Sequence, residues 1–201
     1  MEEENRDWYL TISGESEGTY RDKASKFIAN ALPVVSEEEA KSALDRIRKK
    51  YYDANHHCFA YRIGYENFIY RIQDDGEPSG SAGKPIYGQI LSKELYDVLI
   101  VVTRYFGGTK LGIPGLIHAY RTAAKEALEK AVIVESVMMK EYSVQFDYPL
   151  MNEVMRIIKE SGCKIIGQTA GDQYEIRFQI RKRQVGFLES KMQRIRGVTL
   201  R

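Results

Sequence analysis

The stretch from residue 104 to residue 120 reads "RYFGGTKLGIPGLIHAY". It contains cations, aromatic residues and paired glycines, and it leads from an apolar run into an expected helix. Glycines let successive backbone N–H groups form a concave nest, and a helix N-terminus adds partial positive charge. Arg104 can hold a phosphate or carboxylate through two hydrogen bonds, and Lys110 adds a second charge. The segment therefore predicts an anion site. The alternative is a strand-to-helix turn with both cations solvated.

A second glycine-rich segment, "DDGEPSGSAGKP" at residues 74–85, precedes the same apolar run. It lacks the spacing of a Walker-type nucleotide loop, because Pro78 stands where the first glycine must be. A looser Gly/Ser-rich phosphate loop stays open as an interpretation. Since both loops flank the strand expected at residues 98–102, we expect them to converge on one pocket, with His118 at its border. The predicted anion-binding residues are Arg104, Gly107, Gly108, Thr109, Lys110, Gly80, Ser81, Lys84 and His118.

Two details of this pocket are also expected. The backbone N–H groups near Gly107 and Gly108 should be unpaired and exposed, and Gly108 should need a positive φ. The side chain of Arg104 should point into the pocket rather than outward. If Arg104 instead lies against a carboxylate of its own domain, its role is structural.

The sequence offers only weak candidates for catalytic residues. Asp74, Asp75 and Glu77 are weak candidates for binding Mg²⁺, and a solvated turn is the alternative. His56 and Cys58 share one face of an expected strand, but a catalytic pair needs contact between imidazole and sulfur. Parallel neighbours on a strand favour packing instead. The sequence predicts no catalytic residue and no cofactor, and it favours a non-enzymatic protein without deciding the question.

The whole chain has the composition of a globular protein, with 201 residues of which 43% are hydrophobic and 29% charged. No run approaches the roughly 18 apolar residues that a membrane helix needs. The N-terminus has no signal-peptide pattern, and two cysteines far apart suggest neither a disulfide framework nor a zinc site. We expect a soluble cytoplasmic protein with no membrane partner.

Charge is distributed unevenly along the chain. Residues 1–136 carry 18 Lys and Arg against 21 Asp and Glu, whereas residues 137–201 carry 12 against 7. The basic C-terminal part could contact an anionic partner, and a solvated surface is the alternative. The candidates for this second basic face are Arg181, Lys182, Arg183, Lys191 and Arg194.

The C-terminal part has regular periodicity. Residues 141–146 alternate as a half-buried strand, and a helix follows Pro149 and ends near Gly162. Residues 163–169 and 174–180 predict a hairpin, after which a second amphipathic helix leads to a short strand at residues 197–200. This β-α-β-β-α-β order is the ferredoxin-like arrangement, which we assign to a domain at residues 137–201.

The N-terminal part, residues 1–136, predicts an α+β domain. Strands are expected at residues 8–13 and 26–31, and a hairpin around Gly64. Ser36 and Glu39 fit a capping box at the start of a helix that extends to about residue 52. The apolar residues 98–102 suit a central strand covered on both faces, and the segment from residue 114 to about 130 reads as a helix.

The two glycine-rich motifs, "DDGEPSGSAGKP" and "VVTRYFGGTKLGIPGLIHAY", resemble the signature of the IMPACT/YigZ family. Residues 26–64 are similar to the N-terminal region of that family, and the basic tail matches its bacterial two-domain form. The resemblance implies a ribosomal protein S5 domain 2-like fold followed by a ferredoxin-like domain similar to the last domain of elongation factor G. These folds also stand in tandem in that factor, where they meet the ribosome.

The chain departs from the family pattern at two positions. Pro114 stands where the family usually has a glycine, and His118 where it usually has an arginine. Pro114 removes one N–H from the expected nest. Histidine has an unperturbed pKa near 6.5 and is therefore mostly uncharged at pH 7, whereas arginine is charged. Anion binding here is therefore expected to be weaker than in relatives.

Three functions remain open from the sequence. The first is a non-enzymatic, translation-associated regulator that binds RNA, the ribosome or a translation factor through the glycine-rich anion site. The second is an enzyme acting on a phosphorylated small molecule with Mg²⁺. The third is a protein-binding adaptor.

Overall fold

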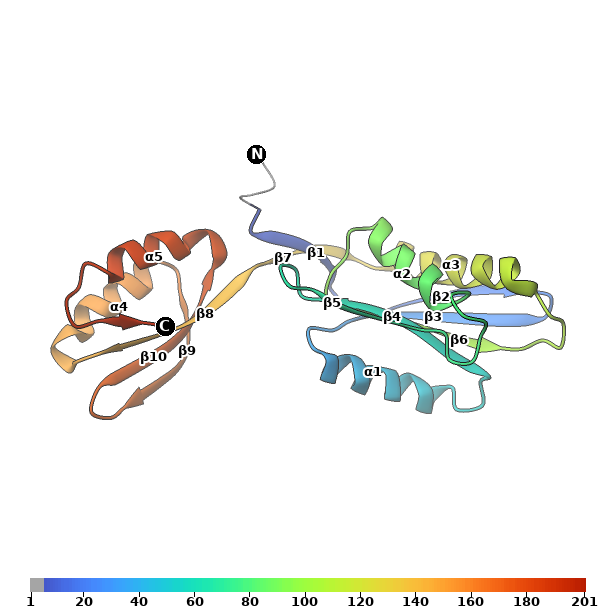
Figure 1. The fold of residues 1–201 in the computed structure, drawn as a ribbon, viewed down its shortest axis with the longest axis horizontal. Coiled ribbons are helices and arrows are strands. Elements are labelled where there is room, and N and C mark those ends of the chain that lie inside the picture. Colours follow the sequence, from blue (N-terminus) through green and yellow to red (C-terminus); the bar gives the residue numbers. More distant parts are fainter. Residues whose placement is uncertain (1–5) are drawn as a thin grey trace. The chain divides into compact units, whose positions relative to one another are not determined.

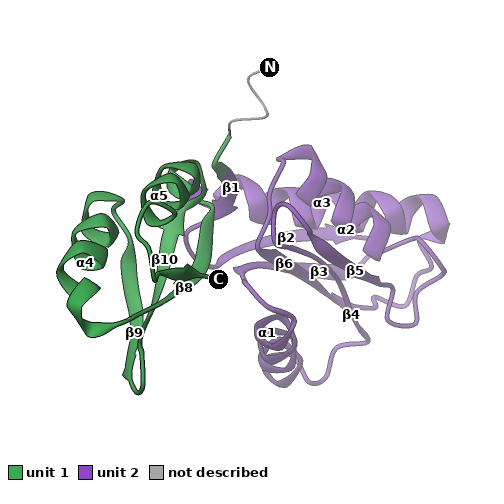
Figure 2. Ribbon diagram, turned by 60° about the vertical axis from the view of Figure 1, so that its left-hand side comes forward, with its two compact units in different colours: residues 1–8, 137–201 green, residues 9–136 purple. Residues whose placement is uncertain are grey.

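The computed structural model describes residues 6–201 and divides them into two compact units (Figure 2). Residues 9–136 form one unit, and residues 6–8 together with residues 137–201 form the other. Each unit buries apolar side chains of its own. No helix within residues 6–201 is long and apolar enough to cross a membrane.

The larger unit is built on a five-stranded antiparallel sheet with strand order β2-β3-β6-β4-β5 (Figure 1). Helices α2 and α3 cover one face of this sheet and α1 covers the other. A separate two-stranded sheet joins β1 to β7. The elements are β1 (Trp8–Ile12), β2 (Ser16–Asp22), β3 (Ser25–Pro33), α1 (Glu37–Lys50), β4 (His56–Ile63), β5 (Ile69–Gln73), α2 (Gly83–Ser92), β6 (Val98–Tyr105), α3 (Gly112–Lys130) and β7 (Ile133–Val137).

Several predictions for this unit are confirmed. The apolar residues 98–102 lie in β6, the middle strand of the sheet, and all five are buried. The hairpin around Gly64 is the β4–β5 pair, and the helix expected from residue 114 is α3, which begins two residues earlier. Ser36 caps α1, because its hydroxyl accepts a hydrogen bond from the Glu39 N–H at 3.1 Å.

The capping box around Ser36 differs in one detail from the predicted form. The carboxylate of Glu39 accepts the N–H of Val35 at 2.9 Å, one residue before the N-cap. In a standard box this bond goes to the N-cap residue itself. The helix start is therefore held from both directions, as expected, but with the second bond displaced by one residue.

Three elements of the larger unit were not predicted from the sequence. Strand β2 has the sequence SEGTYRD, which lacks an alternating apolar pattern, and β7 is a short strand after α3. Helix α2 begins within the Gly/Ser/Pro-rich segment and contains two glycines and a proline, which are poor helix formers. Ile86 and Ile90 are nevertheless buried, so packing on the sheet stabilises this helix.

The smaller unit has the predicted β-α-β-β-α-β order. Its four-stranded sheet has the order β11-β8-β10-β9, and the side chains of Val144, Phe146 and Phe178 are buried in the core that α4 and α5 complete. Gly162, after α4, has the expected positive φ of 64°. The elements are β8 (Met139–Phe146), a 3-10 turn (Tyr148–Leu150), α4 (Met151–Glu160), β9 (Lys164–Ala170), β10 (Tyr174–Arg181), a 3-10 turn (Lys182–Gln184), α5 (Val185–Met192) and β11 (Thr199–Leu200).

Helix α3 lies unusually close to β2. A Cβ atom placed on Gly18 would come within 2.3 Å of the backbone nitrogen of Ala127. Ser16, two residues earlier on the strand, donates a hydrogen bond from its hydroxyl to the Ala127 carbonyl at 2.8 Å. The approach of helix to strand therefore requires glycine at position 18, and it fixes the position of α3 on the sheet.

We predict that Gly18→Ala lowers the free energy of unfolding by about 1–3 kcal/mol or more, because the added methyl group meets backbone that cannot move independently. Gly14→Ala is the matched control, since nothing lies within 4 Å of a Cβ at that position. Urea unfolding of both variants measures the difference. Equal stabilities of the two variants would contradict the close approach.

Candidate anion-binding site

The loop between β5 and α2 is held by the carboxylate of Asp74. Its two oxygens accept three backbone N–H groups, from Gly80 at 2.8 Å, Ala82 at 3.0 Å and Gly83 at 2.9 Å. These donors belong to the last residues of the loop and the first residue of α2. The chain thus supplies its own negative charge at the N-terminus of α2, where an external anion would otherwise find free donors.

Glu77 connects this loop to the second motif. Its side chain is 4% exposed and accepts a hydrogen bond from Arg104 Nη1 on β6 at 2.6 Å. The same oxygen accepts the hydroxyl of Tyr120 on α3 at 2.8 Å. One carboxylate therefore ties the loop, the central strand and α3 together.

Cys58 and His56 extend this buried network from β4. The thiol of Cys58 donates to the Asp74 carbonyl, with Sγ and O 2.9 Å apart, and its Sγ lies 3.2 Å from the Tyr120 hydroxyl. His56 Nδ1 lies 2.8 Å from the Asp75 carbonyl oxygen. Burial raises the pKa of the Cys58 thiol, so this cysteine stays protonated and serves as a core residue, in line with the packing role expected for it.

The three acidic residues considered as Mg²⁺ ligands are each engaged separately. Asp74 accepts the backbone of the loop and Glu77 pairs with Arg104. The Asp75 carboxylate accepts the His57 N–H at 2.7 Å and lies 3.7 Å from Arg48. Within residues 6–201, no group of three His, Cys, Asp or Glu side chains is arranged to hold a metal ion.

Arg104 is the residue for which the structure changes the interpretation most. It does point toward the loop at residues 77–83, but it is only 5% exposed and its charge is compensated by Glu77. Its guanidinium carbon also lies 5.4 Å from the centre of the Phe27 ring. This environment favours a structural role for Arg104 over the anion-binding role that its position in the motif suggested.

The glycine turn after β6 also makes contacts within the fold. The N–H of Gly107 was expected to be free, but it donates to the Ser25 hydroxyl at 3.1 Å. A Cβ on Gly107 would lie 2.2 Å from the backbone of Ala24, so this glycine allows close contact with the β2–β3 turn. Gly108 has the expected positive φ, at 84°, and is exposed together with Thr109 and Lys110.

A groove of about 420 Å³ lies between α2 and α3 on the same face of the sheet. It brings together Gly80 and Lys84 of the first motif with Arg121 of α3. Among the residues that the structure describes, neither Lys84 nor Arg121 has an ion pair, and both are exposed. The remaining lining residues are Pro85, Gly88, Gln89 and Ile117.

Other predicted residues lie away from this groove. Ser81 is buried, and its hydroxyl donates to the Pro78 carbonyl at 2.6 Å. His118 is exposed on α3 and its ring lies edge-on against Tyr20, with 5.6 Å between the centres. The groove thus unites two of the predicted residues, Gly80 and Lys84, and it adds Arg121.

Arg121 was missed because helix α2, which forms the other side of the groove, was not predicted. On the predicted helix it stands four residues after Ile117, next to the apolar stripe of Leu116 and Tyr120. That position identifies a residue beside the buried face. Only the presence of α2 shows that this side of α3 faces another helix and a second cation.

The second basic face is partly neutralised within the smaller unit. Arg181 donates two hydrogen bonds to Asp7, at 2.5 and 3.1 Å, and Arg183 Nε lies 3.6 Å from the same carboxylate. The hydrogen bond from Arg181 holds the pKa of Asp7 below its usual value. Lys191 lies over the Phe187 ring at 5.4 Å, and Arg194 is exposed. Lys182 also has an interaction partner.

The fold and the linked motifs define a mixed α/β protein of two units, in which a buried ion pair joins the loop before α2 to the central strand β6, beside a cationic groove. The Impact N-terminal domain family matches residues 23–128. The chain is 37% identical to the IMPACT family member YvyE of Bacillus subtilis, covering 76% of this chain and 70% of that protein. It is 32% identical to the IMPACT family member YigZ of Escherichia coli, covering 72% of each. The chain therefore belongs to the IMPACT family.

A solved structure extends the similarity to both units. The crystal structure of a hypothetical protein matches 97% of this chain and 97% of its own, with a TM-score of 0.77 and 26% identity. Its resemblance therefore covers the smaller unit, which the family match at residues 23–128 does not reach.

We predict that Arg104→Ala lowers the free energy of unfolding by about 3–5 kcal/mol, because it leaves the Glu77 carboxylate buried without its cation. Lys110→Ala, in the same motif but exposed, should change it by no more than about 0.5 kcal/mol. Urea unfolding checks both values. A stable Arg104→Ala variant that has lost only ligand binding would instead restore the anion-binding role of Arg104.

Proposed function

We propose that this chain is a non-enzymatic, translation-associated regulator that binds RNA, either free or within the ribosome. The contact is centred on Lys84 and Arg121 in the α2–α3 groove. Lys110, in the exposed turn before α3, adds a further contact. This revises the anion site expected from the sequence by removing Arg104 from the ligand contacts.

The observation that carries the proposal is the pair of uncompensated cations in the groove. The buried charges of the motifs are instead neutralised inside the fold, as Arg104 is by Glu77. Lys84 and Arg121 have no such partner among the described residues and line one groove from two helices. A phosphate backbone is the polyanion to which spaced, solvent-facing cations of this kind bind.

Family likeness supports a role in translation. The resemblance implies that the first unit is similar to domain 2 of ribosomal protein S5, and the second, ferredoxin-like unit to the last domain of elongation factor G. Because these folds stand in tandem where that factor meets the ribosome, RNA or a translation factor is the partner class that this pairing favours. The Mg²⁺-dependent enzyme has less support, since Asp74, Asp75 and Glu77 all have internal partners.

Filter binding to ribosomal and messenger RNA fragments at two salt concentrations tests the proposal. The affinity should fall steeply with salt. Lys84→Ala should reduce the magnitude of the slope of log binding constant against log salt concentration by about 0.7, the value for one phosphate contact to a single strand. Arg121→Ala should have the same effect. Neither substitution should change stability by more than about 0.5 kcal/mol, since both side chains are exposed.

Lys49→Ala is the matched control, because it removes one exposed lysine from α1 on the opposite face of the sheet (Figure 1). It should leave the slope unchanged. Binding that is absent, independent of salt, or equally reduced by Lys49→Ala would contradict the proposed function.

A further inference from the structure

Strand β5 forms an edge of the five-stranded sheet, and the start of α2 packs against its last two residues, Ile72 and Gln73. It pairs with β4 on one side and is the last strand of the sheet on the other. An edge strand presents unpaired N–H and C=O groups that can pair with another chain. Natural edges are commonly protected by proline or by several charges, whereas Ile69–Gln73 contains no proline and only one charged residue, Arg71.

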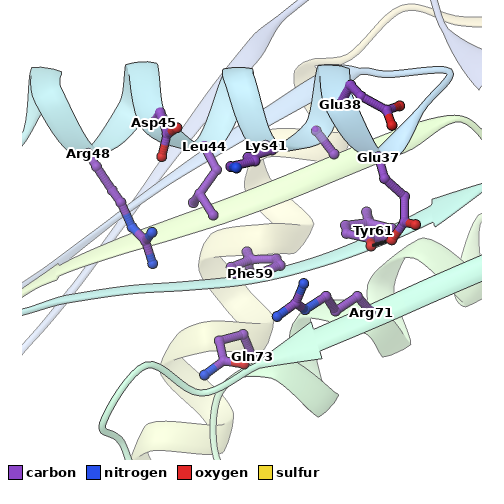
Figure 3. A pocket seen from close by; sticks show the side chains of 11 residues that line it. Glu37, Glu38, Lys41, Leu44, Asp45, Arg48, Phe59, Tyr61, Arg71 and Gln73 are labelled. Carbon is purple, nitrogen blue, oxygen red and sulfur yellow. Dashed lines mark hydrogen bonds between the residues drawn. The ribbon is translucent and has the colours of Figure 1, made fainter.

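A groove of about 620 Å³ lies beside this edge, between α1 and strands β4 and β5 (Figure 3). The stacked rings of Phe59 and Tyr61 form its floor, with centroids 6.3 Å apart. Arg71 of β5 and Arg48 of α1 extend into the space between helix and strand (Figure 3). The charged residues that line the groove are Glu37, Glu38, Lys41, Asp45, Arg48 and Arg71.

The opposite face of β5 is apolar and partly exposed. Tyr70 is 57% exposed and stacks on Tyr87 of α2, with 5.0 Å between ring centres. Phe68, just before the strand, is 42% exposed and lies against Tyr96. Residues next to each other on a strand point to opposite faces, so the single edge of β5 borders a polar groove on one side and an aromatic surface on the other.

We propose that β5 binds an extended segment of a partner protein as a sixth strand of this sheet. The segment alternates acidic and apolar residues. Its acidic side chains lie on the α1 side of the sheet, one of them opposite Arg71, and its apolar side chains lie opposite Tyr70 and cover the exposed rings. This interaction is separate from the α2–α3 groove and does not depend on RNA binding.

Charge complementarity selects the acidic positions. Residues directly opposite on neighbouring strands stabilise the pair when their charges differ and destabilise it when their charges agree. Arg71 is the only charge on β5, and Lys41 of α1 lines the same groove.

The same surface is less suited to a nucleic acid. Its groove is lined by three acidic and three basic side chains, so it offers no net attraction to a polyanion such as a phosphate backbone, and the favourable pairing for a carboxylate is with Arg71 on the strand itself. The alternating donors and acceptors of a strand edge instead match the backbone of a peptide. The geometry therefore favours a protein segment over RNA at β5.

The test uses the full chain, labelled with ¹⁵N, and a short synthetic peptide of alternating Asp and Val. We expect chemical-shift changes at β5 and on the side of α1 that faces the groove, and slower hydrogen exchange at β5 amides. The same peptide with N-methyl groups on alternate residues cannot donate those hydrogen bonds and should lose binding. A Lys–Val peptide should bind at least about fivefold more weakly than the Asp–Val peptide.

A charge swap makes the test specific. Arg71→Glu should reverse the preference, so that the Lys–Val peptide binds more tightly than the Asp–Val peptide. Lys49→Glu is the control, since it makes the same charge reversal on α1 at a residue that does not line the groove. Equal binding of the N-methylated peptide, or no change at β5 with millimolar peptide, would overturn the proposal. Changes at β5 caused by a single-stranded oligonucleotide, without any caused by the peptide, would do the same.

Discussion

The buried ion pair between Glu77 and Arg104 is the interaction on which the arrangement of the larger unit's functional face depends. Removing both charges from water costs several kcal/mol per ion, so the pair persists only with good geometry and further hydrogen bonds. The Tyr120 hydroxyl supplies one of these bonds, and the Asp74 carboxylate separately satisfies three N–H groups of the same loop. Together they hold the loop before α2 against β6 and α3.

This arrangement divides the charged residues of the two motifs into two groups. Inside, Glu77 pairs with Arg104 while Asp74 accepts backbone N–H groups, and these contacts position the loop and α3. Lys84, outside, is left facing Arg121 across the groove, because α2 starts where Asp74 caps it and α3 is anchored through Tyr120. The anion site that we propose is therefore a consequence of the buried network, although it shares no ligand contact with it.

Periodic segments were predictable from the sequence, and contacts between distant segments were not. The alternating strands and amphipathic helices of the smaller unit follow directly from spacing, as do β6 and α3. Helix α2 was missed because glycine and proline mask its short apolar pattern, and the groove with Arg121 was missed with it. Arg104 was placed among the ligand contacts because nothing local indicates that its partner is Glu77, 27 residues earlier.

The central claim is that ligand contacts lie in the α2–α3 groove while Arg104 stays paired with Glu77. A titration of the ¹⁵N-labelled protein with single-stranded RNA, followed through backbone amides and the Arg104 and Arg121 side-chain Nε–H signals, tests it most directly. The account predicts that Arg121 and the first turns of α2, including Lys84 and Gly88, shift with added RNA. The Arg104 signal should remain where it is. A shift of Arg104 that exceeds that of Arg121 would contradict the claim.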